Sequence, residues 1–373
     1  MQIQRHDVKI LSMVVGGAIG LVLFLISGFQ LLEFTDSTAF CGRLCHNVMY
    51  PEYTAHEVSP HSNVLCADCH VGPGASYLVK SKISGIRLIF NTLTGDYERP
   101  ISVPVSNLRP ARETCERCHR PENFSGDLVR VHVTFASDEA NTSHVDTRVL
   151  RVGGGQTTSA KGIHWHITAR IYYLALDEKR QEIGWIGVDR GNGVLTEFVD
   201  PQHASEITPQ KIKAEERLLD CIDCHNRATH IYSSPNDLID TALNNGDIDK
   251  TLPYIKREGL KALDPANDSL TAAYDKIDAI KDFYRQSYPQ VFQNKGPALD
   301  SAVAQLKQVA VLTTFPEMKV TWNTYPSNIG HMDSPGCTRC HGKLVETAGD
   351  EIGKSISVDC QLCHYLDIGQ AFK

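Results

Sequence analysis

One apolar run dominates the hydropathy pattern of the chain and lies near its N-terminus. It extends from Ile10 to Leu32 without a charged residue. A helix of that length spans roughly 34 Å, which is enough for the hydrocarbon core of a bilayer. The run is too long for the apolar region of a signal peptide. The pattern therefore predicts an uncleaved, single-pass transmembrane anchor within residues 1–35.

Further along the chain the pattern changes twice. Residues 124–215 contain no cysteine and hold alternating runs such as LVRVHVTF, HWHITARIYYLALD and IGWIGVD, separated by turn signals such as GGG and RGNG. These runs predict a small antiparallel β module. Residues 236–325 include DSLTAAYDKIDAIKDFYRQSY and PALDSAVAQLKQVAVL, in which apolar residues recur three and four apart. That spacing predicts a helical segment.

The cysteines carry the clearest chemical signal. All twelve fall in six pairs, and a histidine directly follows the second cysteine of every pair. Five pairs have the spacing C-x-x-C-H, which is the haem-attachment pattern, because two thiols one helical turn apart can form thioethers with one porphyrin while the histidine binds its iron. The first pair has three spacer residues. The six motifs are Cys41/Cys45 with His46, Cys66/Cys69 with His70, Cys115/Cys118 with His119, Cys221/Cys224 with His225, Cys337/Cys340 with His341, and Cys360/Cys363 with His364.

Disulfides and zinc sites explain this pattern poorly. Disulfides would not require a histidine after every second cysteine, and structural zinc sites use four such ligands at a time. The sequence therefore predicts a multihaem cytochrome c with six covalently bound c-type haems. The formal net charge is −7 before the haem propionates are counted, so nucleic acid is not an expected partner.

The anchor and the motifs together predict a location. Arg5 and Lys9 precede the apolar run, which argues for a cytoplasmic N-terminus. Since c-type haem is attached on the outer face, we expect a protein of the bacterial inner membrane with its haem domains in the periplasm. The first motif begins eight residues after the apolar run, so the first haem should lie at the membrane surface.

These patterns predict an α+β chain built around its haems. We expect haem-packed modules with little secondary structure, because residues 36–123 hold three motifs and are rich in glycine and proline. The predicted divisions are the anchor (1–35), the module with haems 1–3 (36–123), the β-rich insertion (124–215), the haem 4 segment (216–235), the helical segment (236–325) and the C-terminal module with haems 5–6 (326–373).

Five ordinary haems need five further axial ligands, and histidine suits low-spin electron transfer. His61, His230 and His331 are candidates because they lie near motifs. His164 and His166, in GIHWHIT, would share one face of a strand, so one or both could bind a haem. His132 is a weaker candidate, whereas His56, His144 and His203 are predicted to be surface residues.

The first third of the chain resembles the NapC/NirT family of membrane-anchored cytochromes that oxidise quinol. The resemblance rests on NVMYPEY, SPH and CADCHVGPG, on the lysines that follow, and on the single N-terminal anchor. It covers about residues 1–120. Beyond it, segments such as SNLRPARETCERCH, GIHWH and DCIDCHNRATHIYSSP look like a longer multihaem branch, which is associated with electron export across the inner membrane of anaerobic bacteria.

The resemblance implies two features near the first haem. In the family a methionine takes the iron there, so Met49 competes with His46 as the axial ligand, and the extra spacer residue favours Met49. The family also carries a quinol-site lysine, which corresponds to Lys82 and less closely to Lys80; the alternative is that both lysines anchor the chain to lipid headgroups. A carboxylate that some relatives place near the first haem has no clear counterpart among Leu88, Asn91 and Asp96.

The sequence thus predicts a quinol dehydrogenase of anaerobic respiration. It would oxidise menaquinol or another quinol of the membrane pool and pass electrons to a periplasmic or outer-membrane redox protein. Two alternatives remain open: an electron-relay subunit of a larger membrane complex without its own quinol site, and a catalytic multihaem reductase of the nitrite or sulfite type. The reductase would need an iron with an open position, and no C-x-x-C-K motif is present.

Overall fold

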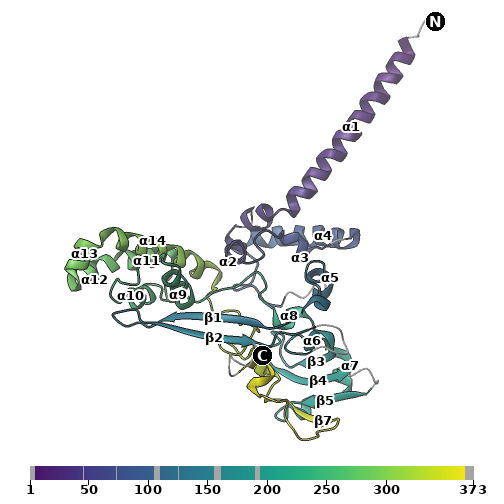
Figure 1. Ribbon diagram of the computed structural model, residues 1–373. Helices are drawn as coiled ribbons and strands as arrows, with labels where there is room; N and C mark the ends of the chain where they lie inside the picture. Colours follow the sequence, from purple (N-terminus) through teal and green to yellow (C-terminus); the bar gives the residue numbers. More distant parts are fainter. Residues whose placement is uncertain are drawn as a thin grey trace.

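The computed structural model describes residues 5–44, 46–72, 74–104, 110–124, 126–154, 161–189 and 194–365. A single helix, α1 (Arg5–Asp36), projects away from the rest of the molecule (Figure 1). Its Lys9–Asp36 stretch is long and apolar enough to cross a membrane, and none of that stretch is buried in the protein. Such a helix, exposed along its length, is what a lipid-facing anchor requires.

Residues 36–123 hold more helix than the sequence predicted. A π-helical turn η1 (Phe40–Leu44) leads into α2 (His46–Glu57), and α3 (Cys66–His70) is followed by the long α4 (Ala75–Thr94); α5 (Ala111–Cys115) and η2 (Pro121–Asn123) complete this part. The expectation of little secondary structure here was wrong, because YLVKSKISGIRLIFNTLT contains no proline and recurs in apolar residues at helical spacing. Gly95 ends α4 in the left-handed conformation (φ 73°), and its N–H bonds the Thr92 carbonyl.

The predicted antiparallel β structure is confirmed, but it forms two sheets. The first has the order β1-β2-β8, and the second has the order β6-β3-β4-β5-β7. Two strands from the end of the chain, β7 and β8, therefore complete sheets made by the β-rich insertion. The bounds are β1 (Leu128–Phe135), β2 (Ser143–Leu150), β3 (Arg170–Ala175), β4 (Ile183–Asp189), β5 (Leu195–Val199), β6 (Arg217–Leu218), β7 (Val345–Ala348) and β8 (His364–Tyr365).

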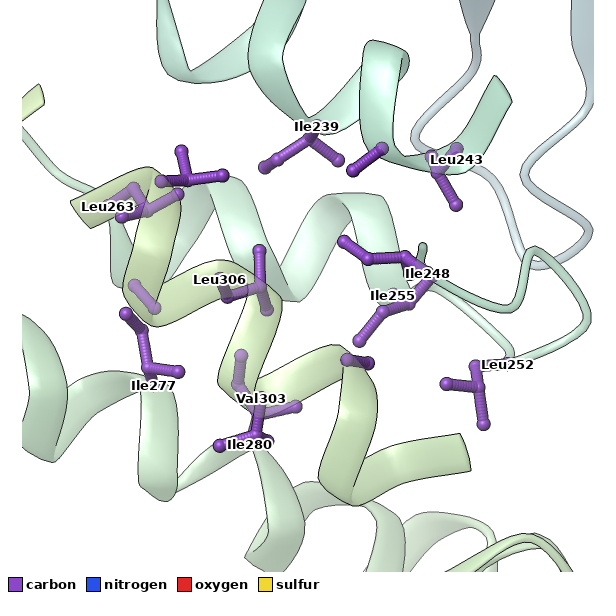
Figure 2. Close-up of a cluster of buried hydrophobic side chains, with 14 of the residues drawn as sticks. Ile239, Leu243, Ile248, Leu252, Ile255, Leu263, Ile277, Ile280, Val303 and Leu306 are labelled. Carbon is purple, nitrogen blue, oxygen red and sulfur yellow. The ribbon is translucent and has the colours of Figure 1, made fainter. Parts of the chain in front are cut away.

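Helices lie where the apolar spacing of residues 236–325 predicts them. Their inward faces form the largest hydrophobic cluster of the described residues, with Ile239, Leu252 and Leu306 fully buried at its centre (Figure 2). This helical unit thus has a side-chain core of its own. Its helices are α9 (Pro235–Asn245), α10 (Ile255–Ala262), α11 (Leu270–Asp278), α12 (Ile280–Ser287), α13 (Pro289–Asn294) and α14 (Gly296–Thr313).

A buried ion pair fastens the helical unit to the first sheet. The Lys256 Nζ donates to the Asp240 carboxylate at 2.6 Å, and the two side chains are 4% and 3% exposed. The same carboxylate accepts the N–H of Phe135 at 3.1 Å, and Lys256 also donates to the Phe135 carbonyl. Because Phe135 ends β1, this polar cluster fixes the end of the β1–β2 hairpin against α9 and α10.

Candidate functional site: paired histidines and the end of the apolar helix

Five pairs of imidazole rings face one another in the structure. Each pair combines the histidine of a cysteine motif with one from elsewhere in the chain, and the ring centroids lie 5.9–6.3 Å apart in all five. The pairs are His70 with His230 (6.3 Å), His119 with His61 (5.9 Å), His225 with His164 (6.3 Å), His341 with His166 (6.0 Å) and His364 with His331 (6.1 Å).

This separation fits a metal held between two imidazoles. An imidazole nitrogen binds a transition metal at about 2 Å, so two rings on opposite sides of one iron have centres about 6 Å apart. Several rings are oriented through their other nitrogen, as metal-binding histidines usually are. The Nδ1 of His230 contacts the Glu52 carbonyl at 3.0 Å, that of His61 contacts the Ala228 carbonyl at 3.0 Å, and that of His166 contacts the Ile163 carbonyl at 2.8 Å. These contacts leave Nε2 for a metal.

Burial favours the uncharged form of three of these imidazoles. It lowers the pKa of His230 to about 4 and lowers the pKa of His70 and of His166 below the ordinary value. A neutral imidazole is the form that binds iron. The donor set therefore fits c-type haem in both geometry and protonation.

The sequence predicted that the GIHWHIT segment is part of a strand, but in the structure it is not. His164 precedes the short helix α6 (Trp165–Thr168), and strand β3 begins only at Arg170. The prediction was wrong because the alternating apolar pattern of the following strand also runs through this segment. On a helical turn two residues two apart point in different directions, so His164 faces His225 whereas His166 faces His341.

Two other histidines depart from the simplest expectations. His132 lies exposed on β1, and within the described ranges no motif histidine faces it. His56, predicted to be a surface residue, is only 5% exposed, and its Nε2 contacts the Val64 carbonyl at 3.0 Å. That prediction was wrong because α2 packs its polar residues inward as well as its apolar ones, with Thr54 and Ala55 also buried.

The motifs lie next to one another in the order of the chain. The thiols of Cys41 and Cys66 hydrogen-bond, as do those of Cys115 and Cys221. The remaining neighbours are close enough for their charges to interact: Cys69 with Cys115, Cys224 with Cys337, and Cys337 with Cys363. Each motif from the first to the fifth thus has the next motif of the sequence as a spatial neighbour.

Cys118, the second cysteine of the third motif, departs from what a haem-packed module leads one to expect. An attachment residue inside such a module should be enclosed, but Cys118 is exposed, and so are Cys69, Cys337 and Cys360. The reason is local: α5 ends at Cys115, and Cys118 lies in the turn that follows, where its N–H bonds the Cys115 carbonyl at 3.1 Å. A thiol must be accessible to form a thioether with a porphyrin, so the role of Cys118 in haem attachment is compatible with this exposure and stays a prediction.

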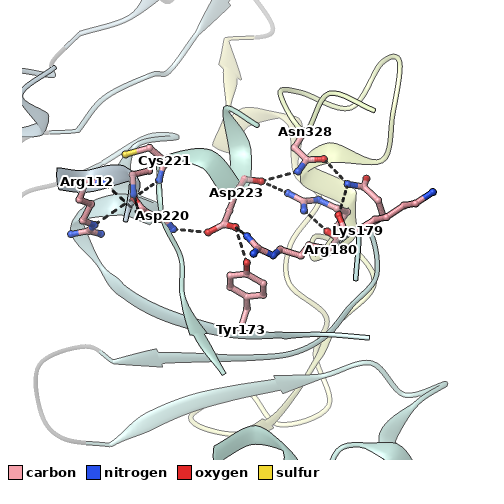
Figure 3. Close-up of polar contacts among 11 residues, drawn as sticks. Arg112, Tyr173, Lys179, Arg180, Asp220, Cys221, Asp223 and Asn328 are labelled. Carbon is pink, nitrogen blue, oxygen red and sulfur yellow. Dashed lines mark hydrogen bonds and ion pairs between the residues drawn. The ribbon is translucent and has the colours of Figure 1, made fainter. Parts of the chain in front are cut away.

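A network of polar contacts connects the third, fourth and fifth motifs (Figure 3). The Asp223 carboxylate, within α8 (Cys221–Cys224), accepts the Tyr173 hydroxyl of β3 at 2.7 Å and pairs with Arg180. Its backbone carbonyl accepts the Arg339 guanidinium at 2.7 Å, which connects it to the fifth motif. On the other side, the Asp220 carboxylate accepts the N–H of Ala111 at 2.8 Å, at the start of the third motif's helix α5.

Of the first motif, only part lies among the described residues. Cys45 and the side chain of His46 lie outside them, so the choice between His46 and Met49 stays a prediction. Met49 is half-buried and packs against a cluster that contains Phe315 and Tyr325.

The predicted lysine Lys82 reaches the end of the apolar helix. Its Nζ donates to the Thr35 hydroxyl at 2.8 Å and forms an ion pair with Asp36, the last residue of α1. Each side chain of the ion pair is 29% exposed. By contrast, Lys80 is exposed on α4. Sequence reasoning missed Asp36, although an acidic residue four positions after an apolar span is itself a signal of a polar site at the membrane edge.

Comparison with known proteins agrees with this picture. The model of the NapC/NirT cytochrome c family, N-terminal region, matches residues 3–103. The chain is 45% identical over 341 residues to the cytochrome c-type protein ImcH of Geobacter sulfurreducens, which covers 91% of this chain but 66% of that relative, so the chain spans about two thirds of its length. It is 30% identical over 121 residues to the cytochrome c nitrite reductase subunit NrfH of Nitratidesulfovibrio vulgaris, or 32% of this chain and 74% of that subunit. No solved structure matches. The chain belongs to the NapC/NirT family of membrane-anchored multihaem c-type cytochromes, which serve electron transport.

Proposed function

We propose that the protein oxidises menaquinol at the membrane surface and conducts the electrons through six c-type haems to a periplasmic or outer-membrane redox partner. The observation that carries this proposal is the ion pair between Lys82 and Asp36, because it sets a cation and a carboxylate at the end of the apolar helix. Cys41 of the first motif follows Asp36 by only five residues. Quinol arriving from the bilayer would meet these groups first.

The twelve motif cysteines would hold the haems through thioether bonds. The five imidazole pairs would supply both axial ligands of haems 2 to 6, and Met49 would bind the iron of haem 1. Their common separation of about 6 Å supports this assignment, since it is the separation that bis-histidine iron needs. When bound, haem supplies an iron that takes up and passes on one electron at a time.

The chain's own residues would handle the protons. Oxidation of a quinol to a quinone releases two electrons and two protons. Bound haem would take up the electrons, and the protons must leave for water. The Asp36 carboxylate would accept a proton from the quinol hydroxyl, and the Lys82 ammonium would donate a hydrogen bond to the quinol oxygen. Their partial exposure gives the proton a route to the outer aqueous phase.

The order of the motifs in space supports conduction in sequence order. Adjacent thiols link motif 1 to 2, 2 to 3, 3 to 4, 4 to 5 and 5 to 6. Electrons that enter at haem 1 would leave from haem 6, in the periplasm, at the other end of the series. The motif pairing also argues against a catalytic reductase, because haems 2 to 6 would each have both axial positions filled.

The test is reduction of the purified, haem-loaded protein by a reduced menaquinol analogue in stopped flow. We expect rapid haem reduction in the intact protein and a loss of about tenfold or more in rate for Lys82→Ala and Asp36→Asn, in line with the usual effect of removing a proton-transfer group. Lys80→Ala tests whether the other lysine of α4 contributes to the rate of haem reduction. Lys307→Ala is the matched control, because it breaks a lysine–aspartate ion pair of the helical unit, with Asp278.

Each outcome decides between the alternatives. If quinol fails to reduce the intact protein while dithionite reduces it, the quinol proposal is wrong and the relay-subunit alternative stands. If Lys82→Ala is reduced as fast as the intact protein, the quinol site lies elsewhere.

A further inference from the structure

Helix α4 exposes an apolar stripe that no part of the described chain covers. Its members recur in steps of four and three residues, which keeps them on one line of the helix surface. Their exposed fractions range from 58% for Val79 to 82% for Leu93. The stripe consists of Val79, Ile83, Ile86, Phe90 and Leu93.

Two further faces of α4 can be distinguished, and the exposed Leu88 (64%) lies outside both of them. Lys80, Ser84 and Arg87 form a polar stripe beside the apolar one, again in steps of four and three, and all three are exposed. The third face, which includes Lys82 and Gly85, is half-buried against the protein. A helix with separate apolar, polar and protein-facing sides is typical of one that lies in the plane of a membrane interface.

The position of α4 identifies what the apolar stripe contacts. Lys82, near the middle of α4, binds Thr35 and Asp36 at the end of α1, so α4 passes the level where the membrane anchor leaves the bilayer. From there it runs in a different direction from α1 rather than continuing it (Figure 1). The apolar stripe therefore lies on a helix that contacts the end of the anchor, and a bilayer surface is the partner that this position favours over a second protein.

Charge supports the same partner. Helix α4 contains two lysines and one arginine and no acidic residue, although the chain as a whole carries a net charge of −7. Cationic side chains beside an apolar stripe attract anionic lipid headgroups. We infer that α4 is a second membrane contact of this protein, embedded in the headgroup region with its apolar stripe turned toward the acyl chains. This inference stands apart from the quinol proposal.

The test measures where α4 lies in a bilayer. Variants of the full haem-loaded chain, each with one added cysteine, are spin-labelled in phosphatidylethanolamine/phosphatidylglycerol nanodiscs. The parent chain, treated in the same way, measures any labelling of its own cysteines. Ile86→Cys and Phe90→Cys report on the apolar stripe, and Ser84→Cys and Arg87→Cys are the matched positions on the polar stripe. Power-saturation electron paramagnetic resonance then compares collisions with oxygen, which enters lipid, and with a water-soluble nickel complex. Saturation under nitrogen corrects for relaxation by haem, and the haem absorption spectrum checks folding.

We expect the oxygen-to-nickel collision ratio to be several-fold higher at the apolar stripe than at the polar stripe. Replacing phosphatidylglycerol by phosphatidylcholine should reduce that difference. Equal access of nickel to both stripes would show that α4 lies in water and would overturn the inference. Exclusion of both reagents from the apolar stripe would also overturn it, because the stripe would then be covered by protein. Neither result depends on whether quinol reduces the haems.

Discussion

A histidine can hold haem iron only if its ring lies at the right distance and one nitrogen is left for the metal. His230 meets both conditions, because its ring lies 6.3 Å from that of His70 and its Nδ1 contacts the Glu52 carbonyl. The two rings come from parts of the chain far apart in sequence. Distal ligands of this kind therefore depend on the fold and cannot be assigned to a particular motif from sequence distance alone.

We predict that His230→Ala removes the sixth ligand of haem 2. Electron paramagnetic resonance of the oxidised protein should lose one low-spin signal and gain a high-spin one, because loss of a strong axial ligand favours high-spin iron. His144→Ala is the matched control, since His144 lies exposed on β2. An unchanged low-spin signal in His230→Ala would contradict the assignment.

Asp200 should make the stability of the β structure sensitive to acid. Its buried carboxylate accepts the N–H of Gln202 at 3.0 Å and pairs with His203 and Lys343. Although desolvation opposes the charged form, the contacts from His203, Gln202 and Lys343 outweigh it, so the pKa of Asp200 lies below its usual value. A lowered pKa stabilises the fold above the unfolded-state value of about 3.9, and this contribution is lost as the pH falls through the folded-state value.

We therefore expect Asp200→Asn to lower the melting temperature at pH 7 and to lower it much less at a pH below the folded-state pKa. Far-UV circular dichroism melts over a pH series measure this effect. Asp350→Asn serves as a control at an exposed position. Equal destabilisation by Asp200→Asn at every pH would mean that the charge of Asp200 does not contribute.

At the scale of the elements, the contact between the helical unit and the β1–β2 hairpin includes a buried charge pair, Lys256 with Asp240. Replacing Lys256 by methionine leaves the Asp240 carboxylate buried beside Phe135 without its cation. Breaking such a pair on one side costs about 3–5 kcal/mol. We predict that Lys256→Met lowers the free energy of unfolding of the helical unit by this amount, measured by urea denaturation.

The double variant Lys256→Met/Asp240→Asn tests whether the unpaired charge causes the loss of stability. It removes the unpaired charge while keeping a hydrogen-bonding group for the Phe135 N–H, so it should recover part of the lost stability. If the double variant is less stable than Lys256→Met alone, unpaired charge is not the cause.

The sequence predicted the elements that depend on local pattern. The anchor and the helices of the helical unit follow from apolar spacing, and the antiparallel strands follow from alternation. It could not show that β7 and β8, which are only a few residues long, complete sheets that begin far earlier in the chain, at Arg170 and at Leu128. It also assigned GIHWHIT to a strand, because two histidines around a tryptophan fit either period over so short a run. Asp36 was missed because the family resemblance points to positions of α4 and not to the end of α1.

At the scale of the whole molecule, successive motifs lie next to one another, which indicates a single series. We predict that loss of one internal haem divides this series. In Cys221→Ser/Cys224→Ser, which cannot form the thioether bonds of motif 4, quinol should still reduce the haems before the break. The haems after it should respond only to dithionite, which is small and reaches every haem.

The measurement compares two changes in Soret absorbance, the change that quinol produces and the full change that dithionite produces. Cys360→Ser/Cys363→Ser is the control, because it removes the last haem and leaves the series before it intact; quinol should then reduce all the remaining haems. Full reduction by quinol in the motif 4 variant would reveal a bypass and contradict a single path.

At helix α6 the ligands of two successive haem sites come from one short segment of the chain. His164 and His166 stand on the same helical turn and face motif histidines of two successive sites. If both histidines bind iron, two haem irons are held by ligands only two residues apart in the chain. The distance between these irons is then limited by the short backbone that joins the two histidines, and depends less on how separate parts of the protein pack. Thermal motion that loosens other junctions would leave this one unchanged, and the electronic coupling between these two haems should vary least with temperature.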